Sequence, residues 1–215
     1  MKSYVVIGLG RFGYETARKL QELGGEVLAM DHMADLVQQI SGDVTQAVVG
    51  DARDVEVLKA LGVADFDCAV VGIGDDLAAS VLITMNLKEM GVPYVVCKAY
   101  DETHSQVLKK LGADQVLIPE HEQADRLAKS LASRNVLDYI ELSDDYGIIE
   151  VPAPGVWQEK SLIELNIRAK LGVNILAVRR GNDITVSPSA DFRIIQGDIL
   201  VVLGNTAALN AMQKL

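Results

Sequence analysis

Hydrophobic and polar positions divide the chain, from residue 4 to about residue 135, into short apolar runs separated by amphipathic stretches. The apolar runs lie at 4–8, 26–30, 46–49, 67–73, 93–98 and 115–118, and the helical patterns lie near 12–23, 33–41, 54–61, 76–90, 102–111 and 120–135. Near-continuous apolar strands with helices between them are typical of a parallel sheet covered on both faces. We therefore predict an α/β fold here, a doubly wound parallel sheet of the Rossmann type.

The pattern changes after Asn135, where β-rich segments separated by turn signals replace the regular alternation. The clearest strand and helix patterns of this part lie at 148–151, 161–171, 199–203 and 205–213. We predict two domains: a Rossmann domain over residues 1–135, with a connector helix at about 120–135, and a small α+β domain over 141–215.

Composition limits the classes of protein to which the chain can belong. The formal net charge is −10 and the isoelectric point is near 4.7, so the chain would repel the phosphates of a nucleic acid. No apolar run approaches the roughly 18 residues of a spanning helix. The first residues run directly into a strand pattern, so we expect no signal peptide. Cys68 and Cys97 lie in apolar segments at a spacing that suits no zinc site, so we expect buried thiols in a cytosolic protein.

A glycine-rich turn follows the first apolar run. Gly8, Gly10 and Gly13 have the Gly-x-Gly-x-x-Gly spacing, and Asp31 closes the second apolar run 18 positions after Gly13. In a Rossmann domain these glycines allow a tight turn, let backbone approach a pyrophosphate, and let the helix pack closely on the strand. The acid accepts from ribose hydroxyls and disfavours the 2′-phosphate of NADP. The motif predicts an adenine nucleotide or dinucleotide site; the alternatives are a turn without a ligand and, for Asp31, a helix N-cap.

Two further strand ends belong to the same edge of the predicted sheet. Asp51 follows the third strand, and Gly72, Ile73 and Gly74 follow the fourth. Ligands of open α/β sheets bind in the crevice outside the carboxyl ends of the strands. We expect these residues to line that crevice, unless they form ordinary turns.

Charged residues in two segments of the chain suit the phosphate end of a nucleotide. Arg11 lies inside the glycine turn, where its guanidinium either stays solvated or grips a phosphate of its own or of a neighbouring subunit's nucleotide. Glu120, Glu122 and Asp125 open the predicted connector helix. Acids at this position either suit the helix dipole or hold a divalent cation beside nucleotide phosphates.

Catalytic groups are harder to find. Tyr94 and Lys98 have the Tyr-x-x-x-Lys spacing of short-chain dehydrogenases, but a proline and two valines make this segment a strand. Four strand residues separate the side chains by roughly 13 Å, too far for one proton relay. His32, His104 and His121 show no catalytic or metal-binding pattern, and no GxxxxGK[ST] motif is present.

With these residues assembled, the chain resembles the RCK (regulator of K+ conductance) proteins. It is similar in particular to the cytosolic Ktr/Trk-type regulatory subunit of bacterial potassium uptake. The resemblance covers essentially the whole chain and is carried by residues 6–13, 78–80, 107–114, 135–143 and 166–172.

The resemblance implies a regulator rather than an enzyme. Such proteins form octameric rings, tetramers of dimers, that dock on the cytoplasmic face of a membrane potassium transporter. ATP and ADP compete for the Rossmann site and favour different ring shapes, with ATP activating, and NAD(H) can occupy the same site. By this resemblance Arg11 reaches the terminal phosphate across the dimer, and Glu120 lies at the dimer interface and binds Mg2+ or Ca2+. The residues expected at the nucleotide site are Gly8, Gly10, Arg11, Phe12, Gly13, Asp31, His32, Asp51, Ala52, Gly72, Ile73, Gly74, Lys98, His104 and Glu120.

The resemblance also implies a second ligand. The C-terminal domain of some relatives binds cyclic di-AMP at its dimer interface, which inactivates transport. The matching residues, which otherwise read as packing and turn residues, are Ile167, Arg168, Asn174, Ile175 and Pro188. Gly72 and His121 depart from the family pattern, which bears on nucleotide preference.

Three functional classes suit a nucleotide-binding α/β chain. The leading hypothesis is a nucleotide-gated regulator, cytoplasmic and attached to the membrane through its transporter. The alternative is an NAD-dependent oxidoreductase whose second domain holds the substrate, but the sequence offers no convincing proton donor for it. A redox-sensing repressor needs a basic reading helix, which this acidic chain lacks.

Overall fold

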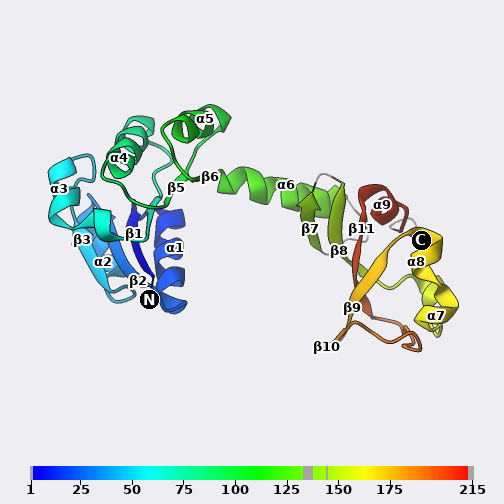
Figure 1. Ribbon diagram of the computed structural model, residues 1–215. Helices are drawn as coiled ribbons and strands as arrows, with labels where there is room; N and C mark the ends of the chain where they lie inside the picture. The colour runs from blue at the N-terminus through cyan, green and yellow to red at the C-terminus, as the bar shows by residue number, and fades with distance from the viewer. Residues whose placement is uncertain (1, 133–137, 144, 213–215) are drawn as a thin grey trace. The chain divides into compact units, whose positions relative to one another are not determined.

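The computed structural model describes residues 2–132, 138–143 and 145–212, and the chain forms two compact units, Met1–Glu120 and His121–Leu215 (Figure 1). Each unit has its own sheet and its own hydrophobic core. Within the described ranges, no helix combines the length and the apolar character that crossing a membrane requires. The domain limits 1–135 and 141–215 stay predictions, and residues 133–135 of the predicted connector lie outside the described residues.

A six-stranded parallel sheet forms the centre of the first unit (Figure 1). Its spatial order is β3-β2-β1-β4-β5-β6, with the bounds β1 (Ser3–Ile7), β2 (Glu26–Asp31), β3 (Gln46–Val49), β4 (Cys68–Val71), β5 (Val95–Lys98) and β6 (Gln115–Leu117). The helices that follow the strands in turn are α1 (Arg11–Glu22), α2 (Ala34–Ile40), α3 (Val55–Ala60), α4 (Leu77–Glu89), α5 (Glu102–Lys110) and α6 (Pro119–Ala132). This strand order is that of the doubly wound Rossmann fold, which confirms the predicted architecture.

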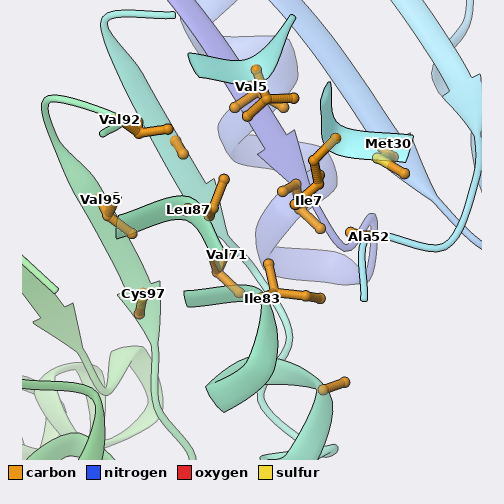
Figure 2. Close-up of a cluster of buried hydrophobic side chains, with 14 of the residues drawn as sticks. Val5, Ile7, Met30, Ala52, Val71, Ile83, Leu87, Val92, Val95 and Cys97 are labelled. Carbon is orange, nitrogen blue, oxygen red and sulfur yellow. The ribbon is translucent and has the colours of Figure 1, made fainter. Parts of the chain in front are cut away.

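Alternate residues of each central strand pack on opposite faces of this sheet. Val5 and Ile7 join a core shared with α3, α4 and α5, whereas Val6 joins a second core shared with α1 and α2. Figure 2 shows the first core, in which Ile83 and Leu87 of α4 lie among strand side chains. A strand buried on both faces needs apolar side chains at successive positions, which explains the continuous apolar runs in the sequence.

The strand order places a crevice at the carboxyl end of β1. β1 lies between β2 and β4, so the loops that follow β1 and β4 lead to helices on opposite faces. The backbone ties both loops to neighbouring strands: Gly8 N donates to Met30 O at 2.9 Å and Gly72 N donates to Ile7 O at 2.7 Å. Doubly wound sheets bind their ligands at such a point.

The second unit is built on a five-stranded antiparallel sheet, which confirms its predicted α+β class. Its order is β10-β9-β11-β8-β7, with the bounds β7 (Asp138–Ser143), β8 (Tyr146–Pro152), β9 (Asn174–Arg180), β10 (Asp183–Val186) and β11 (Ile199–Asn205). Most of α6 also belongs to this unit, together with the helices α7 (Leu162–Leu165), α8 (Ile167–Leu171) and α9 (Thr206–Met212). Trp157, Ile149 and Leu200 belong to the core of this unit.

The single helix predicted over 161–171 is two short helices. Ser161 and Glu164 form a reciprocal capping box at the start of α7, and Asn166 ends it in the left-handed conformation, with φ of 46°. Asparagine is one of the few residues that adopts this conformation at modest cost. The break lets Leu165 and Ile167, on either side of it, both be buried.

Candidate nucleotide-binding site

The three glycines of the first turn meet different surroundings. Gly8 has φ of +89°, and a Cβ atom there would lie 2.6 Å from Cγ1 of Ile73. A Cβ atom on Gly13 would lie 1.8 Å from the carbonyl oxygen of Gly8, so α1 begins against the backbone of the turn. A Cβ atom on Gly10 would meet nothing within 4 Å. Packing therefore requires glycine at Gly8 and Gly13, whereas Gly10 borders open space.

The N-terminus of α1 faces this open space. Gly10 occupies the N-cap position, and no side chain bonds to the cap. The first amide groups of a helix have no acceptor inside the helix, and the helix dipole adds positive potential there. The turn thus offers backbone donors to an anion at the point where Gly10 leaves room.

Asp31 links the end of β2 to the glycine turn. Its side chain is buried; Oδ2 accepts from Leu9 N at 2.7 Å and Oδ1 accepts from Met33 N at 2.9 Å. The N-cap of α2 is Met33, so Asp31 is not the cap of that helix. A carboxylate held by two backbone amides at the crevice is suited to accept from ribose hydroxyls through its remaining lone pairs.

A pocket of about 360 Å³ opens at the crevice. Eight residues predicted for the nucleotide site line it: Gly8, Gly10, Asp31, His32, Asp51, Ala52, Gly72 and Ile73. Its other lining residues are Ile7, Met33, Leu36, Gly50, Arg53, Asp75, Asp76, Ala79 and Ile83. Seven predicted residues are not part of its lining: Arg11, Phe12, Gly13, Gly74, Lys98, His104 and Glu120.

The pocket is acidic. Its lining holds four aspartates and one arginine. Arg53 forms a fork with Asp51, its Nε lying 2.9 Å from Oδ1 and its Nη2 lying 2.7 Å from Oδ2. These hydrogen bonds lower the pKa of Asp51 to about 2, so it is ionised at neutral pH. Such a lining repels phosphates and suits the hydroxyl and amino groups of a nucleoside.

Arg53, Asp75 and Asp76 were not predicted as site residues. Arg53 follows Asp51 by two positions, and Asp75 follows Gly74 directly. Asp76 also caps α4, because its Oδ1 accepts from Ala79 N at 2.9 Å. Extending the strand-end rule by two residues would have found all three.

A second group of charged side chains lies outside the pocket lining. Lys98 Nζ donates to Glu120 Oε1 at 2.7 Å and lies 6.0 Å from the ring centroid of Phe12. The hydrogen bond from Lys98 is the main cause that lowers the pKa of Glu120, and the charge of Arg11 adds to it. Among the residues that the structure describes, Arg11 forms no ion pair. Arg11 and Lys98, the cations that suit phosphates, thus lie outside the lining of the acidic pocket.

His104 is buried in the first unit, whereas Tyr94 is exposed. His104 is 2% exposed, and its Nδ1 accepts from Tyr100 N at 3.2 Å. Burial lowers the pKa of His104. Tyr94 donates to Gln115 and Lys98 to Glu120, so the two side chains bond to different partners and form no relay with each other.

A divalent cation would find one protein ligand at Glu120. Within the described part of the chain, no three His, Cys, Asp or Glu side chains gather into a metal-binding group. Mg2+ in phosphate sites is held by one or two carboxylates together with phosphate oxygens and water. Glu120, exposed at the start of α6, fits that arrangement only beside phosphates; Glu122 and Asp125 are also exposed on α6.

The residues predicted for cyclic di-AMP divide into buried and exposed positions of the second unit. Ile167 is buried and Ile175 packs against the same core. Arg168 and Asn174 are exposed, and Pro188 is partly buried. Pro188 follows Ser187, whose N donates to Leu176 O at 2.8 Å beside the start of β9.

Comparison with known proteins shows the same two-part organisation. Residues 4–119 match the TrkA-N domain, and residues 147–215 match the TrkA-C domain. The chain is 43% identical over 213 residues to the Ktr system potassium uptake protein C of Bacillus subtilis (strain 168), covering 99% of this chain and 96% of that protein. It is 41% identical over 204 residues to the Ktr system potassium uptake protein A of the same organism, covering 95% and 92%.

Solved structures share the fold. The RCK domain of GsuK aligns with a TM-score of 0.71 at 20% identity, covering 100% of this chain and 47% of that one. The GsuK channel bound to NAD aligns with a TM-score of 0.68 at 19% identity, covering 100% and 39%. The solved structures share the fold, a Rossmann domain followed by a small α+β domain, and the matched families define the class as a TrkA-N domain followed by a TrkA-C domain. Within that class, the chain belongs to the Ktr family of potassium uptake proteins, as its sequence motifs predict.

Proposed function

We propose that this chain is the cytoplasmic, nucleotide-sensing regulatory subunit of a potassium uptake system. It binds ATP or ADP at the glycine turn, and the bound nucleotide sets the activity of a potassium transporter in the membrane. Relatives 43% and 41% identical are named potassium uptake proteins, which supports this assignment. The assignment is carried by one observation, the separation of an acidic pocket at the crevice from open helix amides and cations outside it.

This separation determines the orientation in which a nucleotide binds. The nucleoside enters the acidic pocket, where Asp31 accepts from the ribose. The phosphates are repelled by the carboxylates and pass Gly10 toward the start of α1. Arg11 and Lys98 lie beyond the pocket, where each additional phosphate adds charge. ATP and ADP therefore differ only where these cations lie. This arrangement favours a sensor that distinguishes ATP from ADP by the terminal phosphate.

The sensor is proposed to act as a ring. Two copies form a dimer in which Arg11 reaches the terminal phosphate of the partner's nucleotide, and four dimers form an octamer on the cytoplasmic face of the transporter. Arg11 is exposed and forms no ion pair within the described residues, which leaves its guanidinium available for a phosphate. ATP must bind the active ring shape better than ADP does, because a ligand shifts an equilibrium only by its differential affinity.

Three further ligands belong to this proposal. Mg2+ or Ca2+ binds Glu120 beside the phosphates, and NAD(H) occupies the same pocket. Cyclic di-AMP binds the second unit near Arg168 and Asn174 and inhibits transport. The exposure of Arg168 and Asn174 supports that assignment, because both side chains are open to a ligand.

A ligand screen and one variant test the proposal. ATP, ADP, NAD, NADH and cyclic di-AMP, each with and without Mg2+, should raise the melting temperature of the full chain by an amount that grows with the ratio of ligand concentration to Kd. Arg11→Ala should narrow the difference between ATP and ADP in transporter-driven flux into vesicles, whereas Arg18→Ala, on the same helix, should leave it unchanged. If the Arg11 variant and the unaltered chain distinguish ATP from ADP equally well, Arg11 does not contact the terminal phosphate.

The chain is proposed not to be an enzyme, although the pocket also suits an NAD-dependent oxidoreductase. That activity needs a proton donor beside the nicotinamide, and Tyr94 and Lys98 are engaged elsewhere. Oxidation of NADH in the presence of a panel of small carbonyl compounds would support the oxidoreductase alternative. We expect no turnover.

A further inference from the structure

One ion pair joins the last residue of β5 to the start of α6, beside the glycine turn. Lys98 Nζ lies 2.7 Å from Glu120 Oε1. The two side chains differ in exposure: that of Lys98 is 18% exposed, whereas that of Glu120 is 69% exposed. The lysine is therefore the fixed partner, and the carboxylate is the one that solvent and ions reach.

Packing holds the Lys98 side chain in place. A Cβ atom on Gly74 would lie 3.2 Å from Lys98 Cε, so the lysine stem occupies the space that a glycine leaves there. The ring of Phe12 lies 6.0 Å from Lys98 Nζ on the side of the glycine turn. A buried stem with a charged end is the usual way in which lysine covers apolar surface. Here that arrangement delivers the ammonium to Glu120.

The ammonium and a divalent cation compete for the same oxygens. A cation bound to Glu120 would lie about 2.0–2.6 Å from a carboxylate oxygen. Lys98 Nζ already lies 2.7 Å from one of these oxygens, and the two positive charges repel each other at such separations. A divalent cation therefore binds Glu120 well only when the ammonium has another anion to contact.

We infer that Lys98 is a built-in competitor for the cation site on Glu120, displaced when a nucleotide phosphate draws its ammonium away. This inference rests on the proposed function, because it needs a phosphate near the start of α1. Phosphate and divalent cation then bind cooperatively, and linkage makes the effect reciprocal: each raises the affinity for the other. Lys98 thereby makes cation binding depend on the nucleotide that is present.

Binding of Mn2+ to the nucleotide-free full chain, counted by electron paramagnetic resonance of the free ion, tests the competition directly. Lys98→Met removes the charge and keeps an unbranched apolar stem. We expect it to bind Mn2+ about two- to fivefold more tightly than the unaltered chain, given the usual strength of such pairs. Adding Glu120→Gln should abolish the gain. Lys110→Met, which removes a lysine charge from an exposed position of α5, is the matched control and should change nothing.

Unaltered or weaker Mn2+ binding by a folded Lys98→Met variant would overturn the inference. Lys98→Gln is the second variant, in case the first fails to fold, and near-native melting temperatures establish folding for either. Titration of ATP and ADP in the presence of EDTA measures nucleotide binding without any cation. Failure of that titration would refute the proposed function, whereas intact nucleotide binding with unchanged Mn2+ affinity would refute only the role of Lys98.

Discussion

The carbonyl oxygen of Gly8 lies 1.8 Å from the position that a Cβ atom on Gly13 would occupy. The end of β1 and the start of α1 therefore touch through backbone alone. Gly72 adds a second contact, since a Cβ atom there would lie 2.8 Å from the same oxygen. Glycine at these positions sets how closely the helix approaches the crevice, and thereby where its first amides meet a ligand.

Gly13→Ala should disrupt this contact. The added methyl group meets a backbone oxygen, which cannot move away as a flexible side chain does, so α1 must shift from β1. We expect the free energy of unfolding of the first unit to fall by about 3 kcal/mol, at the upper end of overpacking effects. Urea unfolding followed by circular dichroism measures the loss. A variant as stable as the unaltered chain would show that the turn relaxes easily.

Gly10→Ala separates binding from folding at the same turn. The residue has φ of −60°, which alanine adopts freely, and its Cβ atom would meet nothing within 4 Å. Stability should therefore change little, whereas the methyl group fills the space through which phosphates approach the α1 amides. We expect the affinities for ATP and ADP to fall at least about tenfold, a cost of roughly 1.4 kcal/mol. Isothermal titration calorimetry measures this, and undiminished affinity would place the phosphates elsewhere.

Most of the first unit follows from local pattern. A strand buried on both faces requires apolar residues at successive positions, so the sequence predicts β1, β2 and β4. The glycine turn is equally visible, because its spacing reflects backbone contacts such as that between Gly8 and Gly13. The relation between Asp31 and the turn is visible as spacing too. The hydrogen bond that Asp31 accepts from Leu9 N depends on how two loops meet in space, and it appears only in the structure.

The parts that local pattern did not predict depend on tertiary contacts. The helix pattern over 161–171 continues through Asn166, and only the burial of residues on both sides requires the break. The Arg53–Asp51 fork is formed by residues two positions apart. Its place in the nucleotide site could not be predicted, because the pocket that both residues line is formed by tertiary contacts. The pairing of Lys98 with Glu120 joins residues 22 positions apart at two different strand ends.

Asp31→Asn should weaken both the turn and the nucleotide site. The carboxylate accepts from two backbone amides, whereas an amide side chain has one acceptor oxygen and would turn its NH2 group toward a second donor. We expect a loss of about 1–3 kcal/mol in the free energy of unfolding, as for a buried donor left without a partner. Asp35→Asn, at an exposed position of α2, is the control and should lie within about 0.5 kcal/mol of the unaltered chain.

Arg53→Gln should weaken the binding of all adenine nucleotides to the same extent. Arg53 neutralises Asp51 and fixes its orientation, and Asn86 Nδ2 donates to the Arg53 carbonyl at 3.3 Å, which holds the loop. Without the guanidinium the pocket gains net negative charge at the nucleoside end. Titration with ATP, ADP and NADH should show affinities reduced by a common factor, about three- to tenfold. A change confined to ATP would place a phosphate beside Arg53 and reverse the proposed direction of the nucleotide.

Asp198 should make the second unit sensitive to acid. Its carboxylate is fully buried, and it accepts from Arg180 Nε at 2.8 Å, Arg180 Nη2 at 2.9 Å and Ile195 N at 2.9 Å. The Arg180 hydrogen bonds are the main cause that lowers the pKa of Asp198 below its ordinary value of 3.8. Because the folded pKa is the lower one, the ionised carboxylate stabilises the fold above the ordinary value. This stabilisation is lost as the pH falls from there through the folded pKa.

Asp198→Asn tests this dependence at two pH values. At pH 7 it should lower the free energy of unfolding by about 2 kcal/mol, because hydrogen bonds to a charged group are lost inside the fold. Toward pH 3 the variant and the unaltered chain should converge. Trp157 is the chain's one tryptophan and lies in the core of the second unit, so its fluorescence during urea unfolding follows this unit alone. Asp191→Asn, at an exposed position, is the control, and a pH-independent difference for Asp198→Asn would show that its charge contributes nothing.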